Sequence, residues 1–348
     1  CGTAVRDGAA PGSTPPAIKE DRPLPSLGAL IEFFRDPAKQ VLRSELGLRL
    51  AALEDDRLDE DEPLAPGADH PEGFARDLFF AALEAGTEAV PEAAREALQL
   101  GGLLPPGALG ERRFAIEWNQ ASFLLGALRA SEPAPEGPLS PPQPLALRVP
   151  LSGGRVLEGR LLLRHEASGR PWLIEVHGRE RKSLGFRALL PLAVAGAALR
   201  LAGHPPPGLA LLGKDGVHEA GAVLASLPPD PARDAAFLEA LIGFREGVLR
   251  GERRYAPDTS WTAAWIGDHG PEGVAEAWTG RTDRRGERDR SPGYAALWGR
   301  AWRFVPGDGE AERFAADARH LQALWQALTG QEGLSPRPSK GRRKGDAA

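Results

Sequence analysis

The sequence lacks the residues that mark several protein classes. Its single cysteine, Cys1, cannot form a disulfide within the chain, which fits a reducing compartment. It has no methionine, so a chain beginning at Cys1 is expected to be processed, cut or translated from an unusual start, with a lipidated Cys1 as an alternative. No apolar run reaches the roughly 20 residues that span a bilayer. We therefore expect a cytoplasmic protein without membrane contact.

Familiar catalytic motifs are also missing. No Gly-Lys-Ser/Thr follows a predicted strand, which excludes a phosphate-binding loop for ATP hydrolysis. There is no Gly-x-Ser-x-Gly elbow, and the seven histidines and one cysteine do not cluster at zinc spacing. We therefore predict no metal and no cofactor. The formal net charge of −5 means that any DNA contact must come from local basic patches or from partners.

Composition divides the 348 residues into six segments. The clearest change is a proline-rich stretch before residue 145, after which runs of β-formers begin. In order we predict a flexible lead-in (1–25), a helical segment (26–130), a Pro-rich linker (131–144), an α/β core (145–250), a Trp-rich helical segment (251–330) and a basic, disordered tail (331–348).

Within the first helical segment, the pattern predicts a helix from Leu27, a second from Pro37 to about Leu50, helices over 72–100 broken at Pro91, and one over 120–130. Within the core it predicts strands over 145–149, 156–164, 172–176, 209–212 and 217–224, and helices over 182–201 and 230–249. Strands that alternate with long helices indicate an α/β fold with a mixed sheet.

An acidic stretch over 54–62 is open to two interpretations. It could hold a divalent metal, or it could be a solvated loop. We favour the loop, because carboxylates that repel one another beside Pro63 and Pro66 have no calcium-loop spacing and no ordered scaffold.

The most informative region is 156–203. Many DNA nucleases place one acidic residue on a strand and a second on the next strand, followed two residues later by lysine, so that the carboxylates hold magnesium. Aligned on that hairpin, Leu162 stands where the first acid is needed, Glu175 keeps the second position, and His177 replaces the lysine. A single carboxylate binds magnesium poorly. We therefore predict a nuclease-like, PD-(D/E)XK-type core with a degenerate catalytic site; the alternative is an active magnesium nuclease that uses Glu158 and Glu175.

Four stretches, in order, resemble the carboxy-terminal part of RecC, the gamma chain of exodeoxyribonuclease V. They are Leu30–Pro37 with Leu42–Leu48, Asp59–Leu64, Leu103–Gly110, and Trp278–Gly280 with Gly286–Asp289 and Tyr294. The resemblance implies a nuclease-like fold without catalytic residues, RecB-like and RecD-like partners, and contact with double-stranded and separated single-stranded DNA. The family's Chi-recognising, helicase-like region has no counterpart among these residues. A fragment, a split subunit and a decayed gene product stay open as alternatives.

Three basic clusters are candidates for contact with DNA phosphates, namely Arg179, Arg181 and Lys182; Arg250, Arg253 and Arg254; and Arg281, Arg284 and Arg285. The last is interleaved with acids, so a solvated loop is an equal alternative there. The tryptophans at 261, 265, 278, 298 and 302 could stack on separated bases, but such residues are more often core or interface anchors. We predict core or interface positions for them.

Overall fold

The computed structural model describes residues 23–44, 74–87, 89, 92–281, 284–290, 293–294, 298, 304–305 and 307–330. The predicted acidic loop over 54–62 and the basic tail over 331–348 lie outside these residues, as do Trp302 and residues 1–22 of the predicted lead-in.

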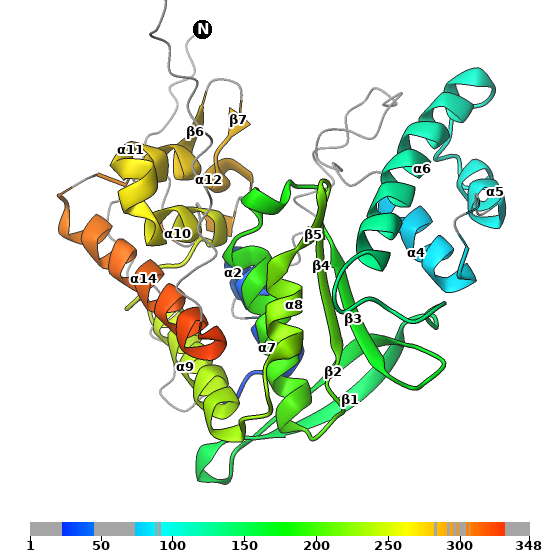
Figure 1. Cartoon of the computed structure of the whole chain (residues 1–348). Coiled ribbons are helices and arrows are strands. Elements are labelled where there is room, and N and C mark those ends of the chain that lie inside the picture. Colours follow the sequence, from blue (N-terminus) through cyan, green and yellow to red (C-terminus); the bar gives the residue numbers. More distant parts are fainter. Residues whose placement is uncertain are drawn as a thin grey trace, which may run out of the picture.

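A five-stranded mixed sheet lies at the centre of the molecule (Figure 1). Its strands follow one another in chain order: β1 (Gln143–Pro150), β2 (Val156–His165), β3 (Pro171–Val176), β4 (Gly208–Gly213) and β5 (Gly216–His218). Neighbours are antiparallel except for β3 and β4, which are parallel and are joined by the crossover helix α7 (Phe186–Leu201). The predicted α/β class and the first four strands are confirmed.

One predicted strand is wrong. The segment over 217–224 was expected to be extended, but β5 ends at His218 and helix α8 (Glu219–Ser226) follows. The Nδ1 atom of His218 accepts a hydrogen bond from the backbone N–H of Ala220 at 3.1 Å, which caps the new helix. A short apolar run has the same composition in a strand and in a buried helix, so periodicity could not separate the two.

Each face of the sheet packs against its own helices. On the face we call the α7 face, Leu147, Leu157 and Leu211 join the larger core, which α1 (Leu27–Arg35), α7 and α9 (Pro231–Leu249) complete. On the opposite α6 face, Trp172 and Leu212 join a smaller core with α4 (Ala75–Ala85) and α6 (Ala108–Arg129). Figure 1 shows the two sets of helices on either side of the strands.

The helices of the α7 face begin close to where sequence signals place them. Asp230 caps α9 by accepting a hydrogen bond from the Arg233 N–H at 3.0 Å, and Pro231 occupies the first helical position. The predicted helix over 230–249 is therefore confirmed. The one predicted from Lys182 begins later, at Phe186, because residues 181–183 form a separate 3-10 turn; it continues through Pro191.

Helix α6 is longer than the predicted 120–130, because it begins directly after the Pro-Pro-Gly connector. A Cβ at Gly110 would lie 1.9 Å from the carbonyl oxygen of Pro105, so only glycine lets the connector lie against the first turn. Two further helices in this part are α2 (Pro37–Ser44) and α5 (Glu92–Leu100). Helix α4 ends at Ala85 and α5 begins at Glu92, and Pro91, where the helices were predicted to break, lies outside the described residues.

The carboxy-terminal part packs against α7 and α9, the helices that cover the α7 face. It contains α10 (Pro257–Ala264), α11 (Ile266–Thr279), the short hairpin β6 (Gly280–Arg281) and β7 (Arg284–Arg285), α12 (Glu287–Arg290) and α14 (Gly309–Thr329). Trp278 is buried in the core, and Trp261, Trp265 and Trp298 are partly buried against it, which confirms the core prediction for these four; Trp325 of α14 is buried in the same core. Within the described ranges, no helix is long and apolar enough to cross a membrane.

Candidate functional site

Glu175 is the second-to-last residue of β3, and its carboxylate is largely buried. Its side chain is 11% exposed, and its Oε1 lies 2.5 Å from the Nη2 of Arg35, the last residue of α1. Its Oε2 lies 3.4 Å from the Nε2 of His177. A cationic guanidinium therefore occupies the side of the carboxylate that faces α1.

Arg35 and Glu175 each stabilise the charged form of the other. Burial alone would raise the pKa of Glu175, but the nearby His177 side chain and the charge of Arg35 together lower it below its usual value. Burial alone would lower the pKa of Arg35, but Glu175 and Glu32 together raise it. Both groups are therefore ionised at neutral pH.

The structure does not bring Leu162 to Glu175, which corrects the pairing predicted from sequence. Side chains alternate along a strand, so a shift of one residue moves a side chain to the other face. On β2, Leu161 and Leu163 point into the core of the α7 face, whereas Leu162 is 62% exposed on the other side. On β3, Leu173 packs on the α7 face, and Glu175 follows two residues later. Leu161 and Leu163, rather than Leu162, are therefore the β2 residues on the face of Glu175.

Glu158, the second carboxylate of the active-nuclease alternative, is also on the opposite face. Like Leu162 it occupies an even position of β2; it is exposed and pairs with Arg148 of β1 at 3.0 Å. Glu158 and Glu175 therefore cannot share one ion. Across the described residues, no group of three or more His, Cys, Asp or Glu side chains could hold a metal ion.

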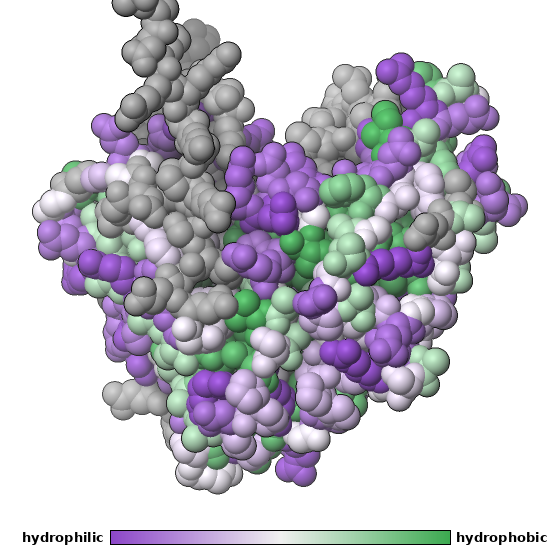
Figure 2. Space-filling view, viewed as in Figure 1, coloured by the Kyte–Doolittle hydropathy of each residue, from purple (hydrophilic) through white to green (hydrophobic). Residues whose placement is uncertain are grey.

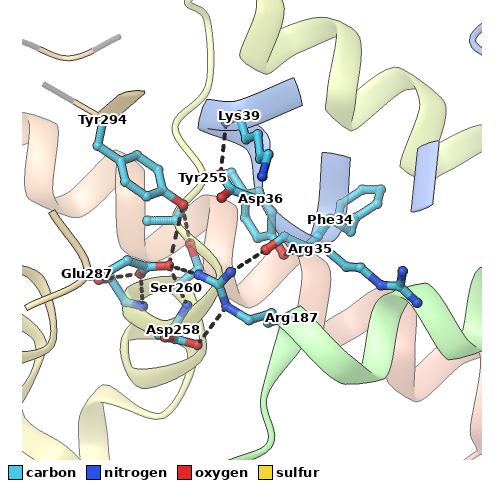
Figure 3. Close-up of polar contacts among 12 residues, drawn as sticks. Phe34, Arg35, Asp36, Lys39, Arg187, Tyr255, Asp258, Ser260, Glu287 and Tyr294 are labelled. Atoms are coloured by element: carbon cyan, nitrogen blue, oxygen red, sulfur yellow. Dashed lines mark hydrogen bonds and ion pairs between the residues drawn. The ribbon is translucent and has the colours of Figure 1, made fainter. Parts of the chain in front are cut away.

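Behind this pair lies a buried polar network, shown in Figure 3. Arg187, in the first turn of α7, donates to the backbone carbonyl oxygen of Arg35 at 2.7 Å and to Glu287 of α12 at 3.1 Å. It also lies 3.5 Å from the carboxylate of Asp258 on α10. Asp258 in turn accepts two hydrogen bonds of 2.9 Å from Arg179, which follows β3. The network links α1, α7, α10 and α12.

Glu287 is the acceptor at the centre of the network, and it is 1% exposed. It accepts hydrogen bonds from the backbone N–H and the hydroxyl of Thr259 at 2.7 and 2.9 Å, from the N–H of Asp258 at 3.2 Å, and from the Tyr294 hydroxyl at 3.4 Å. A buried carboxylate with this many donors is satisfied, and replacing Glu287 would remove an acceptor from several donors at once.

The two tyrosines of the network stay protonated. Burial raises the pKa of both Tyr255 and Tyr294 well above the usual value, and Glu287 raises both further. Tyr255 donates to the backbone carbonyl of Phe34 at 3.0 Å. Arg187 stays charged, since Asp258 and Glu287 outweigh the burial that would lower its pKa. The network is thus built for fixed geometry, with each group held in one protonation state.

Sequence reasoning did not single out Arg187, Tyr255 or Glu287. Apart from the resemblance to RecC, Glu287 was noted only as one of the acids among the arginines that follow Arg281, where DNA contact and a solvated loop were equal alternatives. The signal that could have marked it was its place, with Tyr294, in the fourth of the stretches that resemble RecC.

Most of the proposed DNA-contacting side chains are engaged with carboxylates of this chain. The pairs are Arg179–Asp258, Arg181–Asp215, Lys182–Glu180, Arg250–Glu252, Arg253–Asp317, Arg254–Glu310 and Arg281–Glu276. Exposed pairs of this kind are weak and can exchange partners. Lys182 and Arg281 are the most exposed of these cations, Arg285 is exposed as well, and the side chain of Arg284 lies outside the described part.

A family model for the RecC C-terminal domain matches residues 24–267. The chain belongs to this family. The matched stretch contains Arg35, the whole sheet, Glu175, His177 and Arg187, and it ends in α11. The resemblance to RecC is therefore confirmed, and the family ties the chain to DNA repair and recombination by exodeoxyribonuclease V, the RecBCD complex. No curated protein matches the sequence.

Proposed function

We propose that the chain is the carboxy-terminal part of a non-catalytic RecC-like subunit. In this role it assembles in the cytoplasm with RecB-like and RecD-like subunits and guides double-stranded and separated single-stranded DNA. The observation that carries the proposal is the family match over 24–267 together with the state of Glu175, whose carboxylate is held by Arg35.

The charges around Glu175 support the non-catalytic role. A metal-dependent nuclease needs carboxylates that are free to bind a divalent cation, and a cationic group to stabilise the developing charge on phosphate. Here Arg35 neutralises the carboxylate, and the β2 residues on the same face, Leu161 and Leu163, are apolar. His177 stands in the lysine position and contacts Glu175. The antiparallel β2–β3 pair followed by α7 supports a nuclease-like PD-(D/E)XK core kept as architecture.

The assembly role is supported by the rigidity of the core and by what its surface offers. The network around Glu287 fixes helices that come from four separate segments, which is what a scaffold needs. The surface carries exposed cations, such as Lys182 and Arg281, that could exchange an internal carboxylate for a DNA phosphate.

Reconstitution with the partner subunits tests the proposal. The gene product that contains this chain is co-expressed with the RecB-like and RecD-like proteins of the same genome, and the complex is isolated by affinity and size-exclusion chromatography. We expect one stable complex that degrades linear DNA with magnesium, and the same activity when the chain carries Glu175→Ala. Failure to co-purify would overturn the assembly role. Magnesium-dependent cleavage by the purified chain, abolished by Glu175→Ala, would establish the nuclease alternative.

A further inference from the structure

The outer face of α6 exposes a row of large apolar side chains. Leu109, Ile116 and Phe123 follow one another at intervals of seven residues, and their exposed fractions are 67%, 57% and 52%. The opposite side of the same helix is buried against α4 and the sheet through Phe114, Leu125 and their neighbours. Three large apolar side chains on this face are therefore exposed to water.

Small residues lie beside the large ones. Ala108, Ala115 and Ser122 each directly precede a member of the row, and a Cβ at Gly126, near the end of the helix, would meet nothing within 4 Å. The backbone of a binding partner can therefore approach this face closely. Figure 1 shows α6 and α5 as an arm beside the sheet, away from α7 and α9, and Figure 2 shows hydrophobic residues among hydrophilic ones over that arm.

A spacing of seven residues indicates that this face of α6 binds another helix. Two helices that pack along their length repeat their contacts every seven residues, with large side chains of one fitting between those of the other. Polar residues stand between the large ones at Arg112 and Asn119, and Gly126 follows Phe123 at the same spacing. Such interruptions fix the register of a helix pair, because each needs a matching partner. Arg112 lies between Leu109 and Ile116 and calls for an acidic residue opposite it.

We propose that this stripe, formed by Leu109, Arg112, Ile116, Asn119 and Phe123, docks an amphipathic α-helix of another subunit in the assembly, with an acidic residue of that helix facing Arg112. The inference deepens the proposed function and rests on it. A second copy of the chain fits less well, since a stable interface takes about 20–30 residues from each side, many more than one face of α6 supplies. A helix that belongs to a subunit with further contacts elsewhere does not need the stripe to hold it alone.

The test combines paired variants with site-specific crosslinking. The chain carrying Ile116→Glu and Phe123→Glu is co-expressed with the RecB-like and RecD-like subunits. Leu162→Glu is the matched control, because Leu162 is equally exposed but lies on β2. We expect the double variant to bind at least about tenfold more weakly, with unchanged unfolding temperature and circular dichroism, and the control to bind like the unchanged chain.

A photo-crosslinker at position 116 identifies the occupant in the same complex. An adduct within a predicted amphipathic helix of either subunit supports the proposal. An adduct with a second copy, or with another part of the same chain, overturns it. If the unchanged chain binds the subunits and the double variant binds equally well, the docking stripe is wrong while the proposed function stands. If the unchanged chain does not bind, the proposed function itself fails.

Discussion

Arg35 at the end of α1 and Glu175 near the end of β3 form an ion pair of 2.5 Å between residues 140 positions apart in the sequence. The pair joins the first helix of the matched family region to the centre of the sheet. The backbone carbonyl of the same Arg35 accepts from Arg187, so the end of α1 is held at two points. The carboxylate of Glu175 therefore has a fastening role, because it holds the end of α1 against the sheet.

Replacing Arg35 should destabilise the fold, because Glu175 would be buried without its counter-charge. Arg35→Met keeps most of the aliphatic chain but leaves the carboxylate without its counter-charge. We expect the free energy of unfolding to fall by about 1–3 kcal/mol, less than for a fully buried pair because Arg35 is partly exposed. Urea unfolding measures this. Arg148→Met, which breaks the exposed pair with Glu158, is the control and should cost under about 1 kcal/mol. Equal losses would contradict the fastening role.

Acid should weaken the same contact. The pKa of Glu175 is lowered in the folded chain, so the carboxylate contributes stability above its unfolded pKa and loses that contribution as pH falls through the folded pKa. The unchanged chain should therefore exceed Glu175→Gln in unfolding temperature at pH 7. That difference should shrink below about pH 4.5, where the carboxyl begins to protonate in the unfolded chain. Thermal unfolding of both proteins from pH 7 to pH 3 measures it. A difference that does not change with pH would rule out this linkage.

Glu287 should contribute more to the stability of the fold than its place in an Arg-rich segment suggests. Glu287→Gln preserves shape but removes the charge that faces Arg187 and replaces an acceptor oxygen with a donor. We expect a loss of about 2–4 kcal/mol in the free energy of unfolding, because buried partners are left unmatched. Glu272→Gln, at an exposed position of α11, should change stability by less than about 0.5 kcal/mol. Indistinguishable unfolding curves for the two variants would show that the network does not stabilise the fold.

Sequence predicted those parts of the fold that local pattern determines. Strand β4 was recognisable because all six of its residues are apolar or glycine and buried. Helix α9 was recognisable from its Asp-Pro start. The same reasoning picked Glu175 but placed Leu162 beside it, an error of one residue that alternation turns into the wrong face.

The partners of these residues could not be predicted in the same way. Arg35 and Glu175 are 140 residues apart, and Arg187 and Glu287 are 100 residues apart. No local signal couples such positions, since only the folded packing brings them together. The internal partners of the basic clusters could not be predicted for the same reason. The carboxylate of Asp258 that binds Arg179, for example, lies 79 residues further along the chain.

A glycine should decide the shape of the β6–β7 hairpin. A Cβ at Gly286 would lie 2.3 Å from both the nitrogen of Gly280 and the carbonyl oxygen of Trp278, and backbone cannot yield as a flexible side chain can. Gly286→Ala should cost about 2 kcal/mol or more, or displace the hairpin. Gly243→Ala is the opposite control: it lies in α9 with nothing within 4 Å, so the added methyl should stabilise the helix by about 0.5–1 kcal/mol. Calorimetry should show a lower unfolding temperature for Gly286→Ala and a higher one for Gly243→Ala. An unchanged unfolding temperature for Gly286→Ala would refute the close approach.

The same hairpin allows the DNA-guiding role to be tested by salt. If Arg281, Arg284 and Arg285 contact phosphates, replacing all three with alanine should weaken binding to duplex and to single strands alike. It should also reduce the slope of log affinity against log salt by about 0.9 for each lost duplex contact. Fluorescence anisotropy of the reconstituted complex over a salt series measures both quantities. Arg148→Ala removes an equally exposed arginine of β1 and should leave the slope unchanged. An unchanged slope in the triple variant would mean that the hairpin arginines serve only their internal carboxylates, such as Glu276 for Arg281, and that DNA is guided elsewhere.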